Sequence, residues 1–428
     1  MTRKQPLTIT VFGLGFVGLT TALGFAQQGC RVYGFENNRD RKAMLEAGMI
    51  PFHEPGMAEA MRQHQNRRFF VGEKLEKALQ ESRFIFYCVG TPAGENGEAD
   101  LTQLMNALDQ TLEGIQDEQF RVLIVKSTVP PGTVTERVVP YLQQQGIQPG
   151  THLGIANNPE FLREGCSWED FMHPDRIVLG TSDAMSRRML EELYQPFQAP
   201  IRFVGHTTAE FSKYLSNALL ATMISYANEM AVMADHLGGI ETREAFRILH
   251  DDKRWKNGEM KGYVLPGTGF GGACLPKDTE ALAAAARHKG MDPRMLHRVM
   301  AVNREMPAFT ADRVGRAAAP GDRIGILGLA FKPGSDDVRN TTAVPVIQEL
   351  LHRGYTRLTA YDPLALANFQ AAYPELPLAY SSDLKQLMEN CDALLILTAW
   401  PEFAGLQSRT EKPVIDGRYM LGGDGDET

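Results

Sequence analysis

The residues with the clearest chemical potential lie in one short segment, Gly269–Asp278, with the sequence GFGGACLPKD. Its cysteine, Cys274, stands between a run of small residues and a cation–carboxylate pair, Lys277 and Asp278. The thiolate is the nucleophilic form of cysteine, and a nearby lysine favours it. Asp278 could orient or deprotonate a neighbouring group, and glycines let the backbone approach a bulky ligand. The segment predicts a reactive thiol, with a buried, inert cysteine beside a glycine turn as the alternative.

A second motif, Gly13-Leu14-Gly15-Phe16-Val17-Gly18, predicts a dinucleotide site. It follows an apolar, strand-like run and opens a helical pattern, and Glu36 ends the next strand-like run. Such glycines permit a tight turn and close approach to a pyrophosphate, whose charge the helix N-terminus stabilises. A carboxylate at Glu36 would accept hydrogen bonds from the ribose and disfavour a 2′-phosphate, which predicts NAD. Arg39 and Arg41 keep NADP open as an alternative.

Further hydroxyl and cationic residues follow strand-like runs. Thr91 and Thr128 each come after an apolar run, and Lys332 and Arg339 lie in a loop after a third. Ligands of α/β sheets bind outside the carboxyl ends of the strands. The threonines are therefore candidates for cofactor contact, and the cations suit a phosphate. Ordinary turns and a charged surface loop are the alternatives.

Two pairs of polar residues are spaced by four. Glu160 and Glu164 would share a face if their segment were helical, and Lys213 and Asn217 lie within a long helical pattern. Small residues and Glu210 surround the second pair on its face, so Lys213 could point into a cleft. A solvated helix start and a surface lysine are the alternatives.

Composition narrows the function classes. The chain has 428 residues and a formal net charge of −8, which argues against nucleic acid or an anionic membrane as partner. Its five cysteines are widely spaced without a CxxC motif, which argues against disulfides and a metal site and predicts a reducing, cytoplasmic compartment. The apolar stretch 7–26 resembles a signal peptide, but the glycine motif inside it favours a folded βα unit. No other run is long enough to span a bilayer.

Strand-like runs alternating with helical patterns predict an α/β fold with parallel, doubly wound sheets. We expect an N-terminal Rossmann domain at 1–200, a central helical region at 201–306 and a second Rossmann-like domain at 307–428. A long helix is predicted over 207–235, with a capping box between Thr207 and Glu210 and a stop at Gly238. Its length predicts a bridge between domains or a subunit interface. The tail after Gly422 is expected to be disordered.

Eight segments, in this order, resemble the nucleotide-sugar 6-dehydrogenases of the UDP-glucose and GDP-mannose type: the glycine motif, VGTP, KSTVPPGT, NPEFLREG, HPDRIVLG, AEFSKYLSNA, GFGGACLPKD and FKPGSDDVR. The resemblance covers nearly the whole chain. It implies two Rossmann-like domains joined by a long central helix and a helical dimerisation region, and a homodimer. It also implies oxidation of C6 of a nucleotide sugar to a carboxylate by two NAD.

The resemblance further implies residue roles. Cys274 would trap the aldehyde as a thiohemiacetal and then a thioester. Lys213 and Asn217 would stabilise oxyanion charge, Asp278 would act with a water in proton transfer, and Glu164 and Thr128 would assist hydrolysis. The NAD site would comprise Gly13, Gly15, Phe16, Val17, Gly18, Glu36, Arg41, Thr91, Thr128, Lys277 and Arg339. The sugar-nucleotide site would comprise Glu160, Phe161, Leu162, Arg163, Glu164, Lys213, Asn217, Arg254, Tyr263, Leu265, Gly267, Gly271 and Lys332.

One departure concerns the segment before the cysteine. The family carries an arginine that crosses the dimer to the sugar, and Arg254 is the candidate, but residues 255–262 lengthen the usual spacing. HPDRIVLG and KYLSNA favour UDP-glucose, while the run Pro266–Gly272 also fits GDP-mannose or another UDP-hexose. Two other classes stay open: a non-catalytic NAD-binding module, and a thiol hydrolase, for which no motif supplies a histidine base.

Overall fold

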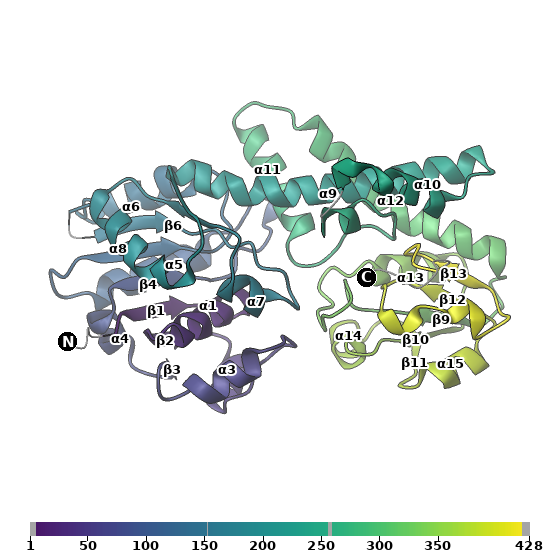
Figure 1. The fold of residues 1–428 in the computed structure, drawn as a ribbon, viewed down its shortest axis with the longest axis horizontal. Coiled ribbons are helices and arrows are strands. Elements are labelled where there is room, and N and C mark those ends of the chain that lie inside the picture. Colours follow the sequence, from purple (N-terminus) through teal and green to yellow (C-terminus); the bar gives the residue numbers. More distant parts are fainter. Residues whose placement is uncertain (1–5, 152, 256–258, 422–428) are drawn as a thin grey trace. The chain divides into compact units, whose positions relative to one another are not determined.

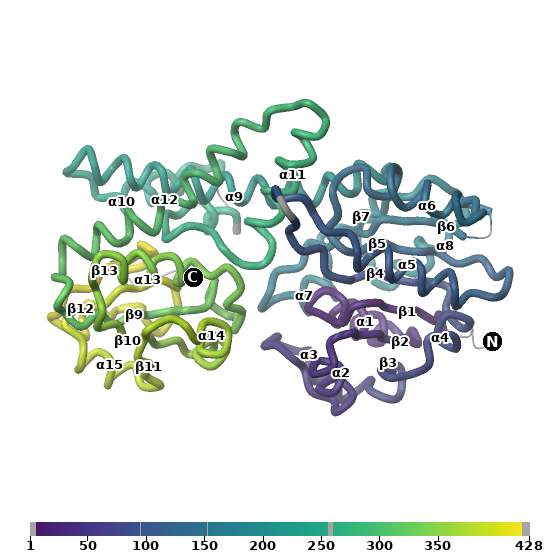
Figure 2. Tube along the Cα trace, turned by 180° about the vertical axis from the view of Figure 1, so that it is seen from behind, coloured from purple at the N-terminus to yellow at the C-terminus, as the bar shows by residue number. Residues whose placement is uncertain are grey.

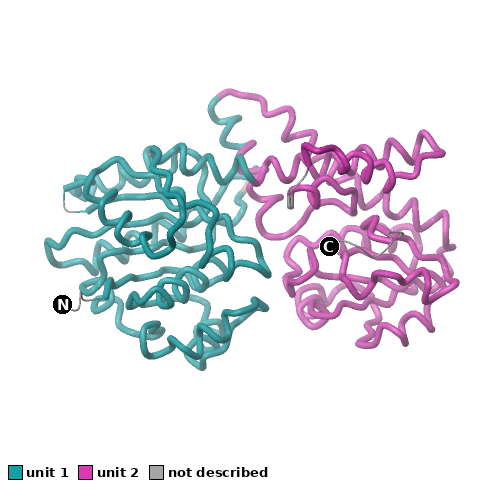
Figure 3. The backbone as a smooth tube through the Cα atoms, in the orientation of Figure 1, with its two compact units in different colours: residues 1–216, 284–289 teal, residues 217–283, 290–428 magenta. Residues whose placement is uncertain are grey.

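The computed structural model describes residues 6–151, 153–255 and 259–421 (Figure 1). The expected tail after Gly422 and residues 256–258 of the lengthened loop lie outside these ranges. The chain divides into two compact units, Met1–Ser216 with Ala284–Lys289, and Asn217–Ala283 with Gly290–Thr428 (Figure 3). The three-domain division of the sequence stays a prediction.

The first unit contains an eight-stranded sheet in the order β3-β2-β1-β4-β5-β6-β7-β8. Its neighbours pair in parallel except β6 and β7, which meet antiparallel at Asn157 and Gly180. The predicted parallel sheet is therefore confirmed, and the antiparallel junction adds a feature that the short runs did not reveal. The strands are β1 (Thr8–Phe12), β2 (Arg31–Phe35), β3 (Phe69–Val71), β4 (Phe84–Tyr87), β5 (Arg121–Val125), β6 (Leu153–Asn157), β7 (Ile177–Gly180) and β8 (Ile201–Val204).

Helices cover both faces of this sheet, because its central strands are apolar on both sides. In β4, Phe84 and Phe86 belong to one core, and Ile85 and Tyr87 to another, as expected when successive side chains point to opposite faces. Figure 2 shows α1, α2 and α3 beside β1, β2 and β3. The helices are α1 (Phe16–Gln27), α2 (Arg39–Glu46), α3 (Met57–His64), α4 (Leu75–Glu81), α5 (Thr102–Gly114), α6 (Val139–Gln144), α7 (Ser167–Met172) and α8 (Ala184–Tyr194).

The second unit contains a five-stranded parallel sheet in the order β11-β10-β9-β12-β13, which confirms the second Rossmann-like pattern. Its strands are β9 (Ile324–Leu327), β10 (Leu358–Tyr361), β11 (Ala379–Tyr380), β12 (Ala393–Ile396) and β13 (Val414–Asp416). Its helices include α10 (Thr242–Asp251), α11 (Leu275–His288, whose last turn belongs to the first unit), α12 (Arg294–Ala317), α13 (Ala343–His352), α14 (Leu366–Ala372) and α15 (Leu384–Asn390).

The acid that follows β10 has a structural role. Asp362 is buried. One carboxylate oxygen accepts hydrogen bonds from the backbone N–H of Leu329 at 2.7 Å, that of Ala330 at 3.0 Å and Trp400 Nε1 at 3.0 Å. The other oxygen accepts from the backbone of residues 364 and 365. Asp362 therefore fixes the glycine turn after β9.

The long helix α9 (His206–Leu237) has 32 residues, or about 48 Å at 1.5 Å per residue. The predicted helix is confirmed, and Gly238 (φ +70°) follows its last turn. The predicted capping box is wrong, because Thr207 lies inside the helix and the Glu210 carboxylate binds the backbone of another segment. Within the described ranges, no helix combines the length and apolarity needed to cross a bilayer.

Candidate active site

The glycine motif forms the turn between β1 and α1. A Cβ on Gly13 (φ +82°) would lie 2.8 Å from the Cys88 carbonyl oxygen, and a Cβ on Gly18 would lie 1.8 Å from the Gly13 oxygen. A Cβ on Gly15 would meet nothing within 4 Å. Two glycines are thus required by packing, whereas Gly15 leaves open space at the N-terminus of α1, where a pyrophosphate is favoured.

Glu36 is fixed beside this turn. Its carboxylate accepts hydrogen bonds from the backbone N–H of Leu14 at 3.1 Å and of Asn38 at 2.8 Å, and pairs with Arg41 Nη1 at 3.2 Å. Arg41 therefore forms an ion pair with Glu36. The Glu36 carboxylate lies beside the turn, where it can accept a hydrogen bond from a ribose hydroxyl. Phe16 and Val17 form the first turn of α1. This arrangement fits NAD.

The predicted threonines after β4 and β5 lie together. Thr91 Oγ1 donates a hydrogen bond to the carbonyl oxygen of Thr128 at 2.8 Å. Ser127 Oγ donates to the Val89 carbonyl oxygen at 2.6 Å. The two loops therefore form one connected edge at the carboxyl ends of adjacent parallel strands, where an α/β sheet binds ligands.

Lys213 and Glu160 form a buried ion pair. Lys213 Nζ lies 2.9 Å from Glu160 Oε1, and each side chain is 7% exposed. Glu160 Oε2 also accepts from the backbone N–H of Leu162 at 2.6 Å. Lys213 is therefore buried rather than a surface lysine, and its placement in a cleft stays a prediction. Glu160 and Glu164 do not share a helical face, because residues 158–163 are not helical.

The residues that follow Glu160 in sequence contact charged side chains. The Phe161 ring lies 5.7 Å from Lys213 Nζ and 4.2 Å from the Arg176 guanidinium. Arg163 pairs with Asp170 at 2.7 Å. These contacts hold the irregular segment that follows β6.

Lys126 was not predicted. It is buried at the end of β5 and donates a hydrogen bond from Nζ to Asn158 Oδ1 at 2.8 Å. Tyr194 donates to the same oxygen at 2.6 Å. Burial lowers the pKa of Lys126, which the nearby Cys88 and Glu160 oppose. A lysine directly after the apolar run 122–125 was the available signal.

The cysteine predicted to be reactive is exposed and directly precedes α11. The Cys274 carbonyl oxygen accepts from the backbone N–H of Asp278 at 2.8 Å. Asp278 is buried and joins two groups: its Oδ2 accepts from Asn217 Nδ2 at 2.7 Å, and its Oδ1 pairs with Lys277 Nζ at 2.6 Å. Asp278, Asn217 and the cysteine helix are therefore brought together, and the charge of Lys277 is shared with Asp278.

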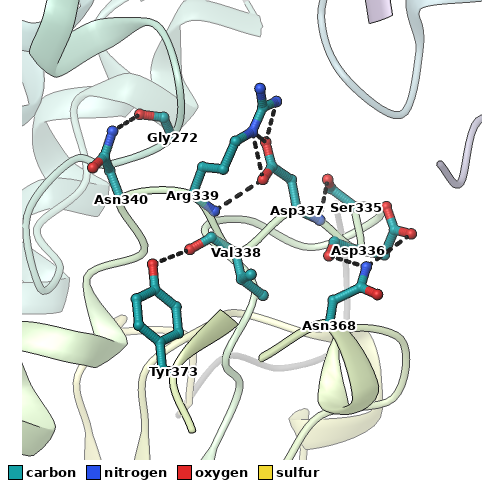
Figure 4. Close-up of polar contacts among 9 residues, drawn as sticks. All are labelled: Gly272, Ser335, Asp336, Asp337, Val338, Arg339, Asn340, Asn368 and Tyr373. Atoms are coloured by element: carbon teal, nitrogen blue, oxygen red, sulfur yellow. Dashed lines mark hydrogen bonds and ion pairs between the residues drawn. The ribbon is translucent and has the colours of Figure 1, made fainter. Parts of the chain in front are cut away.

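The glycine loop before the cysteine lies against the loop after β9 (Figure 4). Asn340 and Gly272 exchange two hydrogen bonds, each 3.3 Å long. A Cβ on Gly271 would lie 2.1 Å from the Asn340 carbonyl oxygen, and one on Gly272 would lie 2.9 Å from the Phe331 ring. The glycine loop before the cysteine and the loop after β9 thus pack directly on each other within the second unit. Glycine makes this close approach possible because it has no side chain.

The predicted cations of this loop have different surroundings. Lys332 is half-buried, with its Nζ 5.8 Å from the centre of the Phe331 ring. Arg339 is exposed and pairs with Asp337 at 2.6 Å (Figure 4). Asp337 therefore orients Arg339, and a planar guanidinium is a group that suits a phosphate.

Arg418 is a second residue that sequence reasoning missed. A Cβ on Gly267 would lie 2.7 Å from Arg418 Nη1, and the Gly267 N–H donates to Asn228 Oδ1 at 2.7 Å. Burial lowers the pKa of Arg418, which Asp416 opposes, and its Nε has no hydrogen-bond partner among the described residues. A buried guanidinium in this state suits an anionic ligand. An arginine two residues after the strand β13 was the available signal.

The remaining predicted residues lie before the glycine loop. Tyr263 ends a short 3₁₀ helix, Glu259–Tyr263, and Leu265 is exposed. Arg254 lies in another, Lys253–Trp255, with its side chain 81% exposed and paired with Asp252 at 2.7 Å. That carboxylate raises the pKa of Arg254. The Arg254 guanidinium therefore lies at the surface of the second unit.

Comparison with known proteins covers nearly the whole chain. Residues 7–198, 207–305 and 325–423 match the NAD binding, central and UDP binding domains of the UDP-glucose/GDP-mannose dehydrogenase family. UDP-glucose 6-dehydrogenase of Pseudomonas aeruginosa is 35% identical over 97% of this chain and 94% of that protein. The structure of UDP-glucose dehydrogenase from the hyperthermophilic archaeon Pyrobaculum islandicum is 36% identical, with a TM-score of 0.89 over 98% and 96%. UDP-D-ManNAc dehydrogenase from Pyrococcus horikoshii is 27% identical, with a TM-score of 0.83 over 98% and 97%.

The five thiols should differ sharply in reactivity. Burial raises the pKa of Cys30 to about 11 and that of Cys88 to about 12, and it also raises the pKa of Cys391. At pH 8 these three are almost wholly protonated and should resist iodoacetamide, whereas the exposed Cys274 and Cys166 should react. Peptide mass spectrometry after brief labelling measures each site, and labelling in denaturant is the control. Faster modification of Cys88 than of Cys274 would contradict the structure.

Proposed function

The chain belongs to the UDP-glucose/GDP-mannose dehydrogenase family, and from this premise we propose that it oxidises UDP-glucose to UDP-glucuronate in two NAD-dependent steps. The family makes it an NAD-dependent nucleotide-sugar 6-dehydrogenase. UDP-glucose is the proposed sugar because it is the substrate named for relatives at 35% and 36% identity.

The observation that carries this proposal is the arrangement around Asp278. Its buried carboxylate accepts a hydrogen bond from Asn217 on α9, while its backbone N–H binds the carbonyl oxygen of the exposed Cys274. A nucleophile at the start of a helix, with an amide and a carboxylate one turn away, suits covalent capture of a carbonyl compound. A protein that bound NAD without catalysis would not require this set.

The first oxidation removes a proton from the C6 hydroxyl and a hydride from C6. The Gly13–Gly18 turn and Glu36 would hold NAD, of which one molecule would accept this hydride and a second, bound after the first NADH has left, would accept the next. Lys213 stabilises the developing alkoxide, because its ammonium is already fixed by Glu160 and needs little reorganisation. Asp278, with a water, takes up the proton.

The second oxidation proceeds on the cysteine. Cys274 Sγ adds to C6 of the aldehyde, and the thiohemiacetal so formed loses a hydride to become a thioester. Asn217 donates a hydrogen bond to the oxyanion. Glu164 and Thr128 then position the water that breaks the C–S bond, which releases the carboxylate and restores the thiol.

The substrate's nucleotide requires cationic groups. We assign it to the second unit, where Lys332, Arg339 and the buried Arg418 lie on loops after parallel strands. The segment Glu160–Arg163 and residues Tyr263–Gly267 complete the proposed sugar-nucleotide contacts. A second candidate, UDP-N-acetylmannosamine, is favoured by the fold shared with the Pyrococcus horikoshii enzyme.

We also propose a homodimer through α9. Its exposed apolar residues recur at helical spacing, at Phe211, Leu215, Leu219, Tyr226, Met233 and Leu237. Such a stripe on one helix favours association with a second copy. The charged, exposed Arg254 is then available to reach a partner's sugar.

The substrate proposal predicts two NADH for each UDP-glucose consumed. Limiting UDP-glucose with excess NAD should give that ratio by absorbance, together with UDP-glucuronate by chromatography. UDP-N-acetylmannosamine and GDP-mannose are the comparison substrates. Turnover of one of these without turnover of UDP-glucose would reassign the sugar, and no turnover of any would favour a non-catalytic NAD-binding module.

Replacing the nucleophile should abolish the four-electron reaction. Cys274→Ser should lower the overall rate by about 10³-fold or more, because an alcohol is a far weaker nucleophile than a thiolate. NADH formation and the products of a single turnover measure this. Cys166→Ser, the other exposed thiol, is the matched control and should keep the parent rate. UDP-glucuronate formed by Cys274→Ser at the parent rate would refute the assignment.

Disrupting the apolar stripe should yield monomers. Leu219, which is 51% exposed on α9, becomes a buried contact in the proposed dimer, so Leu219→Glu would place a charge in an apolar interface. Light scattering coupled to size exclusion gives the mass of each species. Leu364→Glu, at an exposed apolar residue near β10, should remain dimeric. A monomeric parent protein at micromolar concentration would exclude the dimer.

A further inference from the structure

Glu210 is a buried carboxylate that the proposed chemistry does not use. It lies on α9 one turn before Lys213 and is 3% exposed. Its Oε2 accepts a hydrogen bond from the backbone N–H of Gly132 at 2.6 Å. Its Oε1 accepts from the N–H of Val134 at 2.8 Å and from Asn157 Nδ2 at 3.2 Å. A carboxylate enclosed by three donors is held in one orientation.

These partners come from the two segments that carry other proposed site residues. Gly132 and Val134 end the loop that begins after β5 and contains Thr128. Asn157 is the last residue of β6, three positions before Glu160. Its Oδ1 lies 2.7 Å from His206 Nδ1, so the first turn of α9 binds the same asparagine twice. Glu210 thus joins α9 to both segments within the first unit.

We propose that Glu210 is a positioning residue for the oxidation, which clamps the Thr128 loop and the end of β6 to α9 so that Lys213 and Thr128 keep their working geometry. The inference rests on the proposed function for the roles of those two residues. Its physical basis is that a small misplacement of a catalytic group costs a large factor in rate. The clamp itself is a feature of the fold and can be tested without substrate.

The clamp should depend on pH. The three hydrogen-bond partners of Glu210 described above are all donors, so a proton on either carboxylate oxygen would face an N–H group. Burial raises the pKa of Glu210 to about 7, which the hydrogen bonds from Val134, Gly132 and Asn157 oppose and the charge of Glu136 reinforces. As the pH falls through about 7, Glu210 takes up a proton while it remains buried, and the three hydrogen bonds, which are made to the charged form, weaken and free the loop.

Other charged groups around Glu210 respond differently. Glu136 follows the loop and pairs with Lys289. On α9, burial lowers the pKa of His206, which Asp183 opposes, so His206 stays neutral near pH 7. Lys213 is paired with Glu160 on the segment after β6. The Glu210 carboxylate is therefore the group of this cluster whose charge changes near neutral pH.

The stability effect has the opposite sign to the clamp effect because its reference is the unfolded chain, in which Glu210 is solvated, whereas release of the loop leaves Glu210 buried on α9. The folded-state pKa of Glu210 lies above the ordinary value of 4.5, so the folded state binds more protons than the unfolded state between these values. Stability from this group therefore falls as the pH rises through that window. Replacement by neutral glutamine removes this cost, which favours a folded variant.

The first test is the pH profile of Glu210→Gln. In the parent enzyme, kcat with UDP-glucose should fall as the pH is lowered from 8 to 6. At pH 8 the variant should lose about tenfold in kcat or more, and its residual rate should lack this decline. Glu118→Gln, at an exposed glutamate before β5 in the same unit, is the matched control and should keep the parent profile. A parent-like kcat and decline in Glu210→Gln would overturn the proposal.

The second test reads the clamp in the unmodified protein. Hydrogen exchange of the peptide 128–138, corrected for intrinsic rates, should show the Gly132 and Val134 amides about tenfold more protected at pH 8 than at pH 6. Equal protection at both values would also overturn the proposal. This measurement needs no turnover, so failure of the substrate proposal and failure of the clamp are distinguishable.

Discussion

Three buried polar side chains on one face of α9 organise the loops that carry the proposed chemistry. Glu210, Lys213 and Asn217 are spaced by three and four residues, which places them on the same side of the helix. A buried charge or amide is costly unless it is paired. Their partners lie on three different segments: the loop after β5, the segment after β6 and the helix that follows the cysteine. Pairing therefore holds the loop after β5 and the segment after β6 to the start of α9 within the first unit, and it holds the helix after the cysteine to Asn217 within the second unit.

The same arrangement holds the ammonium group of Lys213 in a fixed position. The Lys213–Glu160 pair is buried on both sides, and removal of either partner would leave the other uncompensated, at a cost of several kcal/mol. Lys126 and Asn158 support the same segment from the end of β5. A cation held in this way stabilises a developing alkoxide without first reorganising. Rigid support of this kind is what a site gains from helices and strands.

Local signals in the sequence were sufficient for features whose partners are nearby. The glycine motif and Glu36 act within one βα unit, so their spacing predicted their arrangement. Glu210 was misinterpreted as a capping box because its true partners lie more than fifty residues away. Lys126 and Arg418 gave only a weak signal for the same reason. Burial and tertiary pairing, which a single sequence does not display, decided these cases.

The two Rossmann-like sheets show how one sequence pattern can have two outcomes. Both have a glycine turn, a second strand and a terminal acid. Glu36 accepts three hydrogen bonds, from the backbone N–H groups of Leu14 and Asn38 and from Arg41, and stays beside the open space at Gly15. Asp362, which is one methylene shorter, is buried and already accepts five hydrogen bonds. Its carboxylate has little capacity left for a ribose hydroxyl. Nucleotide recognition by the second unit must therefore rely on other groups, and the buried guanidinium of Arg418, whose Nε has no partner among the described residues, has the charge and the spare donor for a phosphate.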